Sequence, residues 1–295
     1  DACGFFRDLS EALKKTEADA VIIASPSYLH AEHARQSLEA GLGVMVEKPF
    51  TTSVSDALAL LKTAKQAGKP IMVAENFRYV PAERTIRKLM NEKFLGNVST
   101  VTLTDRRNQP ASTQGAWVAD MEFVQLFEIA IHHFDSLRSF FNRKPASICA
   151  QVYNPQGSDY KHGACTKALL ELRGDIHVTY LGTLTSHRYA YALRIEGENG
   201  ELWTNRKWVL FRKKGSRFFR PLKMVDVPPG DGKPYPREGT TSLLNSLRDA
   251  VLLNVVPETA GEDNIWNVAM VAATVLSVKE GRSVSLKEVL DEKEL

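Results

Sequence analysis

The sequence predicts an α/β fold: a partial, parallel-sheet domain of the nucleotide-binding type, followed by an α+β domain with a large, mostly antiparallel open sheet. Three observations predict it. Short apolar runs alternate with helical patterns over the first hundred residues, which is typical of βαβ units. From about residue 145 to 226, segments of alternating polarity are separated by glycine-containing turns, as in antiparallel sheets. Helical patterns then return at the end of the chain.

The first half contains three predicted buried strands with helices between them. The strands are ADAVIIAS (18–25), VMVE (44–47) and IMVAEN (71–76). One helix covers 29–40 and ends at Gly41, and the next is capped by Thr51 or Ser53 and ends at Gly68. Because crossovers between parallel strands are right-handed, the carboxyl ends of the strands share one edge, where ligands bind in such sheets. That edge receives the segments Ser25-Pro26-Ser27, Glu47-Lys48 and Asn76-Phe77-Arg78.

The second half begins with VSTVTLTD (98–105), a half-buried strand, and a long helix is predicted over 122–141. A turn-rich surface loop is predicted over 227–236. The remaining strands are ASICAQVY, CTKALLELR, DIHVTYLGTL, YALRIEGENGELWT and KWVLFRK, and the final helices are SLLNSLRDAVLLN and DNIWNVAMVAATVLSVKEG.

Composition indicates a soluble globular protein, with 43% hydrophobic and 25% charged residues among 295 and a net charge of +3. The basic cluster between Arg212 and Arg220 is interleaved with phenylalanines, a pattern that nucleic-acid surfaces also show. We interpret it as a hairpin with a solvated face and predict neither a nucleic-acid nor a membrane partner. The three cysteines (Cys3, Cys149 and Cys165) are far apart, which indicates a reducing compartment, and we predict a cytoplasmic location.

Two groups of residues are candidates for chemistry. Glu128, His132 and Asp135 are spaced to lie on one helical face, where a carboxylate can orient an imidazole for acid–base work. The alternative is an exposed Glu–His pair, but apolar neighbours indicate a buried helix, on which polar groups need partners. Lys48 is the second candidate, with a solvated lysine paired with Glu47 as its alternative. Neighbouring His133 is interpreted as structural. No HExxH or Cys–His set occurs, so we predict no metal site.

Several motifs resemble those of the glucose–fructose oxidoreductase/inositol dehydrogenase (Gfo/Idh/MocA) family. The family has an A-T-P-x-x-x-H loop, a Leu-Glu-Ala-Gly helix end and a Glu-Lys-Pro motif, and ASPSYLHAEHARQSLEAGLGVMVEKP (24–49) is similar to this series. EIAIHHFD (128–135) resembles the family's D-x-G-x-H-x-x-D helix, and NFRYVPA (76–82) its R-[FY]-x-P stretch. PETAGEDNIWNVAMVAATVLSVKEGRSV (257–284) is similar to its C-terminal motif.

The resemblance implies an NAD(P)-dependent dehydrogenase that acts on a sugar, cyclitol or related polyol. Residues 1–97 would be the C-terminal part of a Rossmann-type domain, and 98–295 a substrate-binding and oligomerisation domain whose helix 262–280 packs back on the first. Lys48, His132 and Glu128 would be catalytic, with Lys48 and His132 in proton transfer. The implied cofactor-binding residues are Ser25, Pro26, Ser27, His30, Glu47, Lys48, Asn76 and Arg78.

The sequence departs from the family pattern at Glu128, where Asp is usual, and at Ala130, where Gly is usual. Family members also begin with a strand, a G-x-G-x-x-G turn, a helix and a second strand. The G-x-G at Gly41-Leu42-Gly43 precedes a strand. We expect a βαβ unit of ~30 residues or more before Asp1 in the complete protein; the alternative is a short chain unable to bind cofactor.

The choice between NAD and NADP, and the substrate, remain open at this point. A non-catalytic family member that binds a nucleotide or sugar and regulates is the alternative function. We expect a homo-oligomer, dimer or tetramer, because a large open sheet usually needs its outer face covered.

Overall fold

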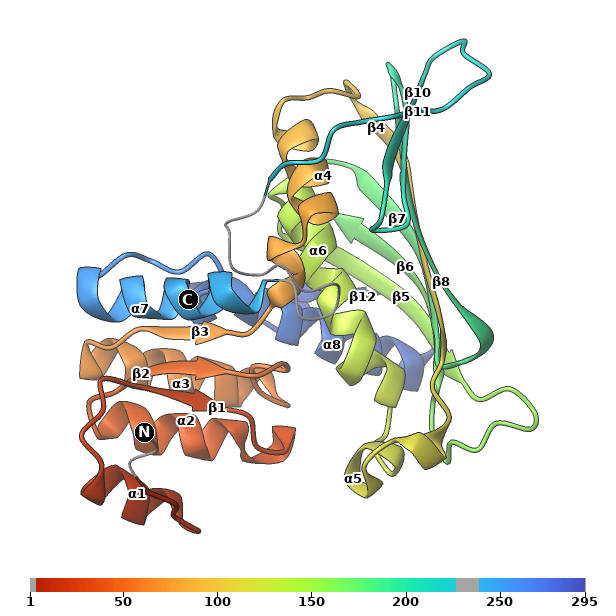
Figure 1. The fold of residues 1–295 in the computed structure, drawn as a ribbon. Coiled ribbons are helices and arrows are strands. Elements are labelled where there is room, and N and C mark those ends of the chain that lie inside the picture. Colours follow the sequence, from red (N-terminus) through yellow and green to blue (C-terminus); the bar gives the residue numbers. More distant parts are fainter. Residues whose placement is uncertain (1–3, 227–238, 295) are drawn as a thin grey trace.

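The computed structural model describes residues 4–226 and 239–294. A small sheet with its helices, red to orange in Figure 1, lies beside a large curved sheet coloured gold to cyan. The blue helices at the end of the chain return toward the small sheet. The loop predicted at 227–236 and Cys3 lie outside the described residues.

The small sheet is parallel and, in the described part of the chain, has the order β1-β2-β3. Its strands are β1 (Ala20–Ile23), β2 (Gly43–Val46) and β3 (Ile71–Val73). Successive strand residues point to opposite faces. Val44 and Val46 therefore pack with α2 (His30–Glu39) and α3 (Val54–Ala67), whereas Met45 packs with α7 (Thr240–Leu253) on the other face.

The helix boundaries follow from local capping. Ser53 is the N-cap of α3, where its hydroxyl accepts a hydrogen bond from the Asp56 N–H at 3.1 Å. Gly68 ends the same helix in the left-handed conformation, with φ of 61°. Gly41, just after α2, also has positive φ, as predicted for a helix end. Further helices that the sequence analysis did not predict are α1 (Leu9–Lys15), α4 (Pro81–Asn91) and α5 (Ala116–Ala119).

The large sheet has the order β11-β10-β9-β8-β4-β7-β6-β5-β12 within the described residues. Only the β4–β7 pair is parallel among the strand pairs described for this sheet, so the prediction of a mostly antiparallel sheet is confirmed. The strands are β4 (Val98–Asn108), β5 (Pro145–Tyr153), β6 (Cys165–Leu172), β7 (Ile176–Thr183), β8 (Thr185–Gly197), β9 (Gly200–Thr204), β10 (Val209–Lys213), β11 (Arg220–Pro221) and β12 (Val284–Ser285).

One face of the large sheet is covered by α6 (Ile131–Phe141) and α8 (Gly261–Glu280), whose apolar side chains share a core with it. The helix α8 contacts α3 and β3 as well as β5, so it joins the two sheets. That contact agrees with the predicted packing of helix 262–280, although the domain division at residue 97 stays a prediction. The basic cluster lies on the β10–β11 pair, an antiparallel hairpin as interpreted.

The long helix predicted over 122–141 is shorter than expected. Phe123 has a left-handed backbone with φ of 55°, and the helix starts as a π-helical turn, η4 (Leu126–Ala130), which continues into α6. Short 3₁₀ turns complete the description: η1 (Ser27–Leu29), η2 (Asn76–Tyr79), η3 (Ala111–Thr113), η5 (Leu286–Glu288) and η6 (Glu292–Glu294). In the described part of the chain, no helix is long and apolar enough to cross a membrane.

Candidate active site

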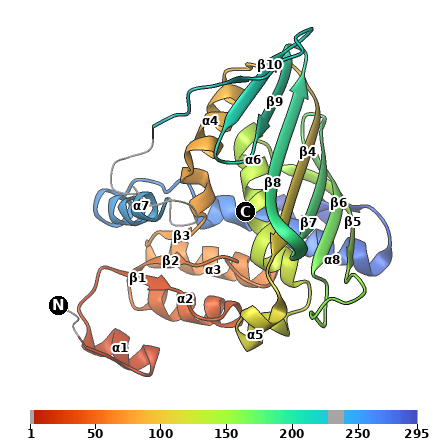
Figure 2. The ribbon, with the colours of Figure 1, turned by 45° about the vertical axis from the view of Figure 1, so that its right-hand side comes forward.

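The carboxyl ends of the three parallel strands face the start of α6 and its π-helical turn (Figure 2). Ser25 follows β1, Glu47 and Lys48 follow β2, and Glu75 follows β3. These segments meet at one edge because adjacent parallel strands end on the same side. The peptide bond between Lys48 and Pro49 is cis.

Lys48 forms an ion pair across the two halves of the molecule. Its Nζ donates to Glu128 Oε2 at 2.7 Å and to the Glu128 carbonyl oxygen at 3.1 Å. Glu47, in contrast, accepts from the backbone N–H of Lys48 at 3.2 Å. The alternative interpretation of Lys48 as a solvated partner of Glu47 is therefore wrong. The lysine and glutamate side chains are 15% and 24% exposed, so a ligand can reach them. We call the space between the strand ends and η4 the cleft.

His132 is oriented by Glu75, which the sequence analysis did not name. The Nδ1 of His132 lies 2.6 Å from Glu75 Oε2, and its ring stacks on Phe77 with centroids 4.4 Å apart. The expectation that Glu128 orients this imidazole is wrong, since Glu128 pairs with Lys48. Because Nδ1 is occupied, Nε2 is the nitrogen available to a substrate. Glu75 ends a buried apolar strand, as Glu47 does, and that was the signal that could have identified it.

The π-helical turn explains why neighbouring polar residues take different partners. Glu128 lies within η4 and His132 just inside α6. A π-helical turn is wider than an α-helical turn, so residues four apart across it no longer stack directly. Glu128 can then face Lys48 while His132 faces Glu75. Such turns are frequent at functional sites.

Burial controls the protonation of the His132–Glu75 pair. Burial lowers the pKa of His132 well below its usual value, and the nearby Lys48 ammonium lowers it further. Burial also raises the pKa of Glu75, and the carboxylate of Asp135 adds to this effect. Burial therefore disfavours a lone charge on either group, which keeps the imidazole able to accept a proton near neutral pH. When the imidazole is protonated, an ionised Glu75 at 2.6 Å can compensate its charge.

The loop after β1 is held by His30. Its ring nitrogens lie 2.7 Å from the Pro49 carbonyl oxygen and 2.8 Å from that of Ser25. His30 is 1% exposed, so it positions the two loops and does not line the cleft. A residue that contacts the cofactor, as expected for His30, would line the cleft. Ser27 is largely buried, and the Ser25 hydroxyl lies 3.0 Å from His33 Nδ1. Pro26 precedes the η1 turn, and Asn76 begins η2.

Arg78 lies in a buried ion-pair network below the cleft. It forms two hydrogen bonds with Asp135, pairs with Asp263 and donates to the Glu258 carbonyl oxygen at 2.7 Å. These partners are all protein groups, and the expectation that Arg78 contacts the cofactor has no support in this geometry. Asp135 lies on the predicted polar stripe, and its partners make it part of the scaffold. Each member of that stripe has a partner on another element, as we predicted for a buried helix.

His133 is also structural in its contacts. Its Nε2 lies 3.1 Å from Asp105 Oδ2, and its Nδ1 lies 3.0 Å from the Tyr180 hydroxyl. Both His133 and Asp105 have no exposed surface. Among the described residues, no group of three or more His, Cys, Asp or Glu side chains could hold a metal ion.

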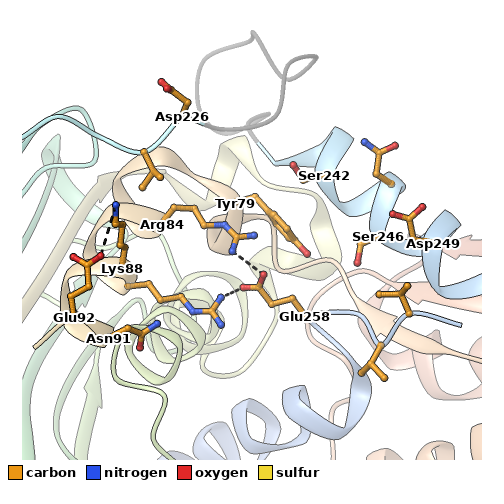
Figure 3. A pocket seen from close by; sticks show the side chains of 15 residues that line it. Tyr79, Arg84, Lys88, Asn91, Glu92, Asp226, Ser242, Ser246, Asp249 and Glu258 are labelled. Atoms are coloured by element: carbon orange, nitrogen blue, oxygen red, sulfur yellow. Dashed lines mark hydrogen bonds and ion pairs between the residues drawn. The ribbon is translucent and has the colours of Figure 1, made fainter. Parts of the chain in front are cut away.

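A separate cavity of about 850 Å³ lies between α4 and α7 (Figure 3). Arg84 and Arg87 line it, and both form ion pairs with Glu258. Neither Lys48 nor His132 lines this cavity. Because both arginines already have a carboxylate partner, we assign no binding role to it.

A parallel sheet of this type, with polar side chains at its carboxyl edge, defines an α/β protein that binds a ligand beyond the strand ends. Comparison with models of protein families supports this class of protein. Residues 2–75 match the model described as "Oxidoreductase family, NAD-binding Rossmann fold", and residues 84–203 match the Gfo/Idh/MocA C-terminal domain. The chain belongs to the Gfo/Idh/MocA family of oxidoreductases. This confirms the expected class, an NAD(P)-dependent dehydrogenase.

Individual relatives are similar over most of the chain. A D-apiose dehydrogenase of Paraburkholderia graminis is 26% identical, covering 96% of this chain and 77% of the relative. An inositol 2-dehydrogenase of Rhizobium meliloti is 22% identical, covering 92% and 81%. The solved structure of an oxidoreductase from Agrobacterium radiobacter, in complex with NAD⁺, L-tartaric acid and magnesium, has a TM-score of 0.86 at 18% identity, covering 96% of this chain and 84% of that one. The structural likeness supports the fold.

Proposed function

We propose that this dehydrogenase transfers a hydride between a nicotinamide cofactor and a hydroxyl-bearing carbon of a sugar, cyclitol or related polyol. The relatives named for D-apiose and inositol support this substrate class. The observation that carries the proposal is the convergence of Lys48 with the turn that leads into His132. Lys48 Nζ bonds both the side chain and the main chain of Glu128, one helical turn before His132.

In the proposed mechanism, His132 is the acid/base. During substrate oxidation its Nε2 accepts the hydroxyl proton, and during reduction it returns that proton. Glu75, bonded to Nδ1, orients the ring and stabilises the imidazolium that forms. Lys48 donates a hydrogen bond to the substrate oxygen as its negative charge develops. Glu128 holds the lysine ammonium in place for this role.

The residues at the strand ends fit the nicotinamide side of a dinucleotide. When bound, the nicotinamide supplies or accepts the hydride. Glu47 is exposed at the edge of the cleft, and the loop of Ser25, Pro26 and Ser27 follows the neighbouring strand. We propose that these residues and Asn76 border the nicotinamide ribose and phosphates. The sequence contains no G-x-G-x-x-G turn, so this assignment concerns the nicotinamide side of the cofactor.

Turnover with NAD⁺ and NADP⁺ on a panel that includes D-apiose and inositols tests the substrate class. His132→Ala and Lys48→Met are each expected to lower kcat by ~10²-fold or more. Cofactor affinity, measured by fluorescence titration with NADH, should change little in His132→Ala. A His132→Ala protein with wild-type turnover would remove the proposed acid/base. A protein that binds dinucleotide but oxidises none of the panel would favour the regulatory alternative.

We also propose self-association through the outer face of the large sheet. Leu169 and Tyr153 are 61% and 40% exposed on neighbouring strands of this face, which is large for apolar side chains. Analytical ultracentrifugation should detect a dimer or tetramer at micromolar concentration. A monomer at that concentration would contradict the proposal.

A further inference from the structure

Behind the candidate acid/base lies a stack of four side chains. The guanidinium carbon of Arg206 lies 4.1 Å from the centroid of the Phe77 ring and 4.0 Å from that of Tyr191. Phe77 in turn stacks on the His132 imidazole, with 24° between the ring planes. A single face of Phe77 has no room for both neighbours at these distances. The order of the stack is therefore Tyr191, Arg206, Phe77 and His132.

Arg206 is held in this stack from two sides. Its Nε donates to Glu83 Oε1 at 2.9 Å, and both side chains are about 5% exposed or less. Its backbone N–H donates to the Thr204 hydroxyl at 2.9 Å. The residue has φ of 68°, in the left-handed region that arginine rarely adopts. The turn after β9 thus directs this arginine inward, although most arginines of the chain lie at the surface.

The elements that supply the stack come from distant parts of the sequence. Tyr191 lies on β8, Arg206 follows β9, Phe77 lies in η2, and His132 begins α6. Glu83 on α4 fixes the arginine. Because Arg206 is buried, it cannot contact a substrate directly. Its effect on the reaction passes through the Phe77 ring and through its charge.

We propose that Arg206 is a positioning residue for the reaction: stacked between Tyr191 and Phe77, it holds the Phe77 ring against His132 and so fixes the plane of the imidazole. The inference rests on the proposed role of His132 as acid/base. A guanidinium suits this place because it is planar and stacks on aromatic faces, whereas a lysine ammonium is a compact point charge. The Glu75 bond fixes Nδ1, and the stack fixes the tilt of the ring. Together they direct Nε2 into the cleft.

The charge of Arg206 acts on His132 together with other groups. Besides the Glu75 partner, the charged groups around the imidazole come from the loop after β2, from β4, from the turn after β9 and from α6 itself: Lys48, Arg107, Arg206 and Asp135. The three cations lower the pKa of His132 and Asp135 raises it. Loss of the Arg206 charge should therefore raise the pKa of His132, and replacement by lysine should leave it nearly unchanged.

The test is proton NMR of the histidine Hε1 signals, which needs no substrate. The His132 signal is identified by its loss in His132→Gln. In the wild-type protein it should lie upfield of the exposed His177 signal, because the Phe77 ring current acts on a stacked imidazole. Arg206→Lys should remove this upfield shift and keep the pKa. The double variant Glu83→Gln/Arg206→Gln leaves no unpaired buried carboxylate. It should remove the upfield shift of the His132 signal and raise the pKa of His132.

Arg212→Gln is the matched control, since Arg212 also stacks on a phenylalanine and pairs with a glutamate but does not act on His132. It should leave both NMR readouts unchanged. Turnover should fall by ~10-fold or more in Arg206→Lys, with the KM for cofactor unchanged. The proposal would be overturned if the His132 Hε1 signal of Arg206→Lys kept the chemical shift that it has in the wild-type protein. It would also be overturned if the His132 signal of the wild-type protein showed no upfield shift. If His132→Ala retains full turnover, the proposed function fails, while the NMR shifts still decide whether the stack exists.

Discussion

Replacing Glu75 by glutamine isolates the contribution of its ionisable carboxyl group to the candidate active site. Glutamine has nearly the same shape and can still accept a hydrogen bond from His132 Nδ1. It cannot stabilise an imidazolium as a carboxylate does. We expect Glu75→Gln to lower kcat and to move the ascending limb of the pH–rate profile for oxidation to lower pH.

The magnitude follows from the 2.6 Å contact between Nδ1 and the carboxylate. Hydrogen bonds to a charged partner contribute about 1.5–3 kcal/mol, against about 0.5–1.5 kcal/mol for a neutral pair. A difference of about 1.4 kcal/mol in the transition state corresponds to tenfold in rate. A mispositioned amide that donates to Nδ1 would cost more, because it favours the wrong tautomer of His132. We therefore expect a loss of roughly 10- to 100-fold.

The direction of the pH shift has a separate physical basis. The carboxyl group of Glu75 either shares a proton with His132 or stabilises the proton on the imidazole. In both cases His132 loses its proton, and so becomes a base, at a higher pH. Without it, His132 titrates alone, and burial lowers its pKa. The profile of kcat/KM against pH reports this change for the free enzyme.

The assay is initial-rate formation of NADH or NADPH from pH 5 to 10 with the best substrate of the panel. Glu201→Gln is a suitable control, because Glu201 is also buried and pairs with Arg194 and Arg212 on the large sheet. It should change stability and leave the pH profile in place. A Glu75→Gln enzyme with wild-type kcat and an unshifted profile would refute the reasoning.

Two outcomes concern stability. Arg78→Met should lower the free energy of unfolding by ~3–5 kcal/mol, measured by urea denaturation, because it leaves the fully buried Asp135 carboxylate without its main partner; a loss below ~1 kcal/mol would contradict this network's role. Burial lowers the pKa of His133 from 6.5 to about 4, so stability present above pH 6.5 should be lost as pH falls toward 4, by roughly 3 kcal/mol. His133→Gln should flatten that loss, whereas exposed His177→Gln should leave it unchanged.

The sequence predicted those parts of the site that lie next to strong local patterns. Lys48 follows a short apolar strand and precedes a proline, and the parallel arrangement of strands brings it to the cleft. His132 lies on a helix whose apolar neighbours indicated burial. Both residues could be placed because strand and helix periodicity depend on near neighbours in the sequence.

The partners of these residues could not be predicted in the same way. Lys48 and Glu128 are separated by 80 positions, and Glu75 and His132 by 57. Local spacing instead suggested a Glu128–His132 pair, because an α-helix brings residues four apart together. The π-helical turn removed that neighbour relation, and no composition signal marks such a turn. Arg206 was missed for a related reason, since an inward arginine in a tight turn has the same sequence signature as a solvated one.

Two pairs of side chains at the cleft join the small sheet to the η4–α6 helix. The acid of one pair lies on the helix, and the acid of the other lies on the small sheet. The small sheet contributes a cation, Lys48, and an acid, Glu75, whereas the η4–α6 helix contributes an acid, Glu128, and a base, His132. Each pair is complete only when the helix lies against the strand ends. Arg78 joins η2 to Asp135 on α6 below them and resists separation of the same surfaces. Proton transfer and packing of the two halves therefore depend on one set of contacts, so a substitution that loosens the boundary should lower kcat even when it lies outside the cleft.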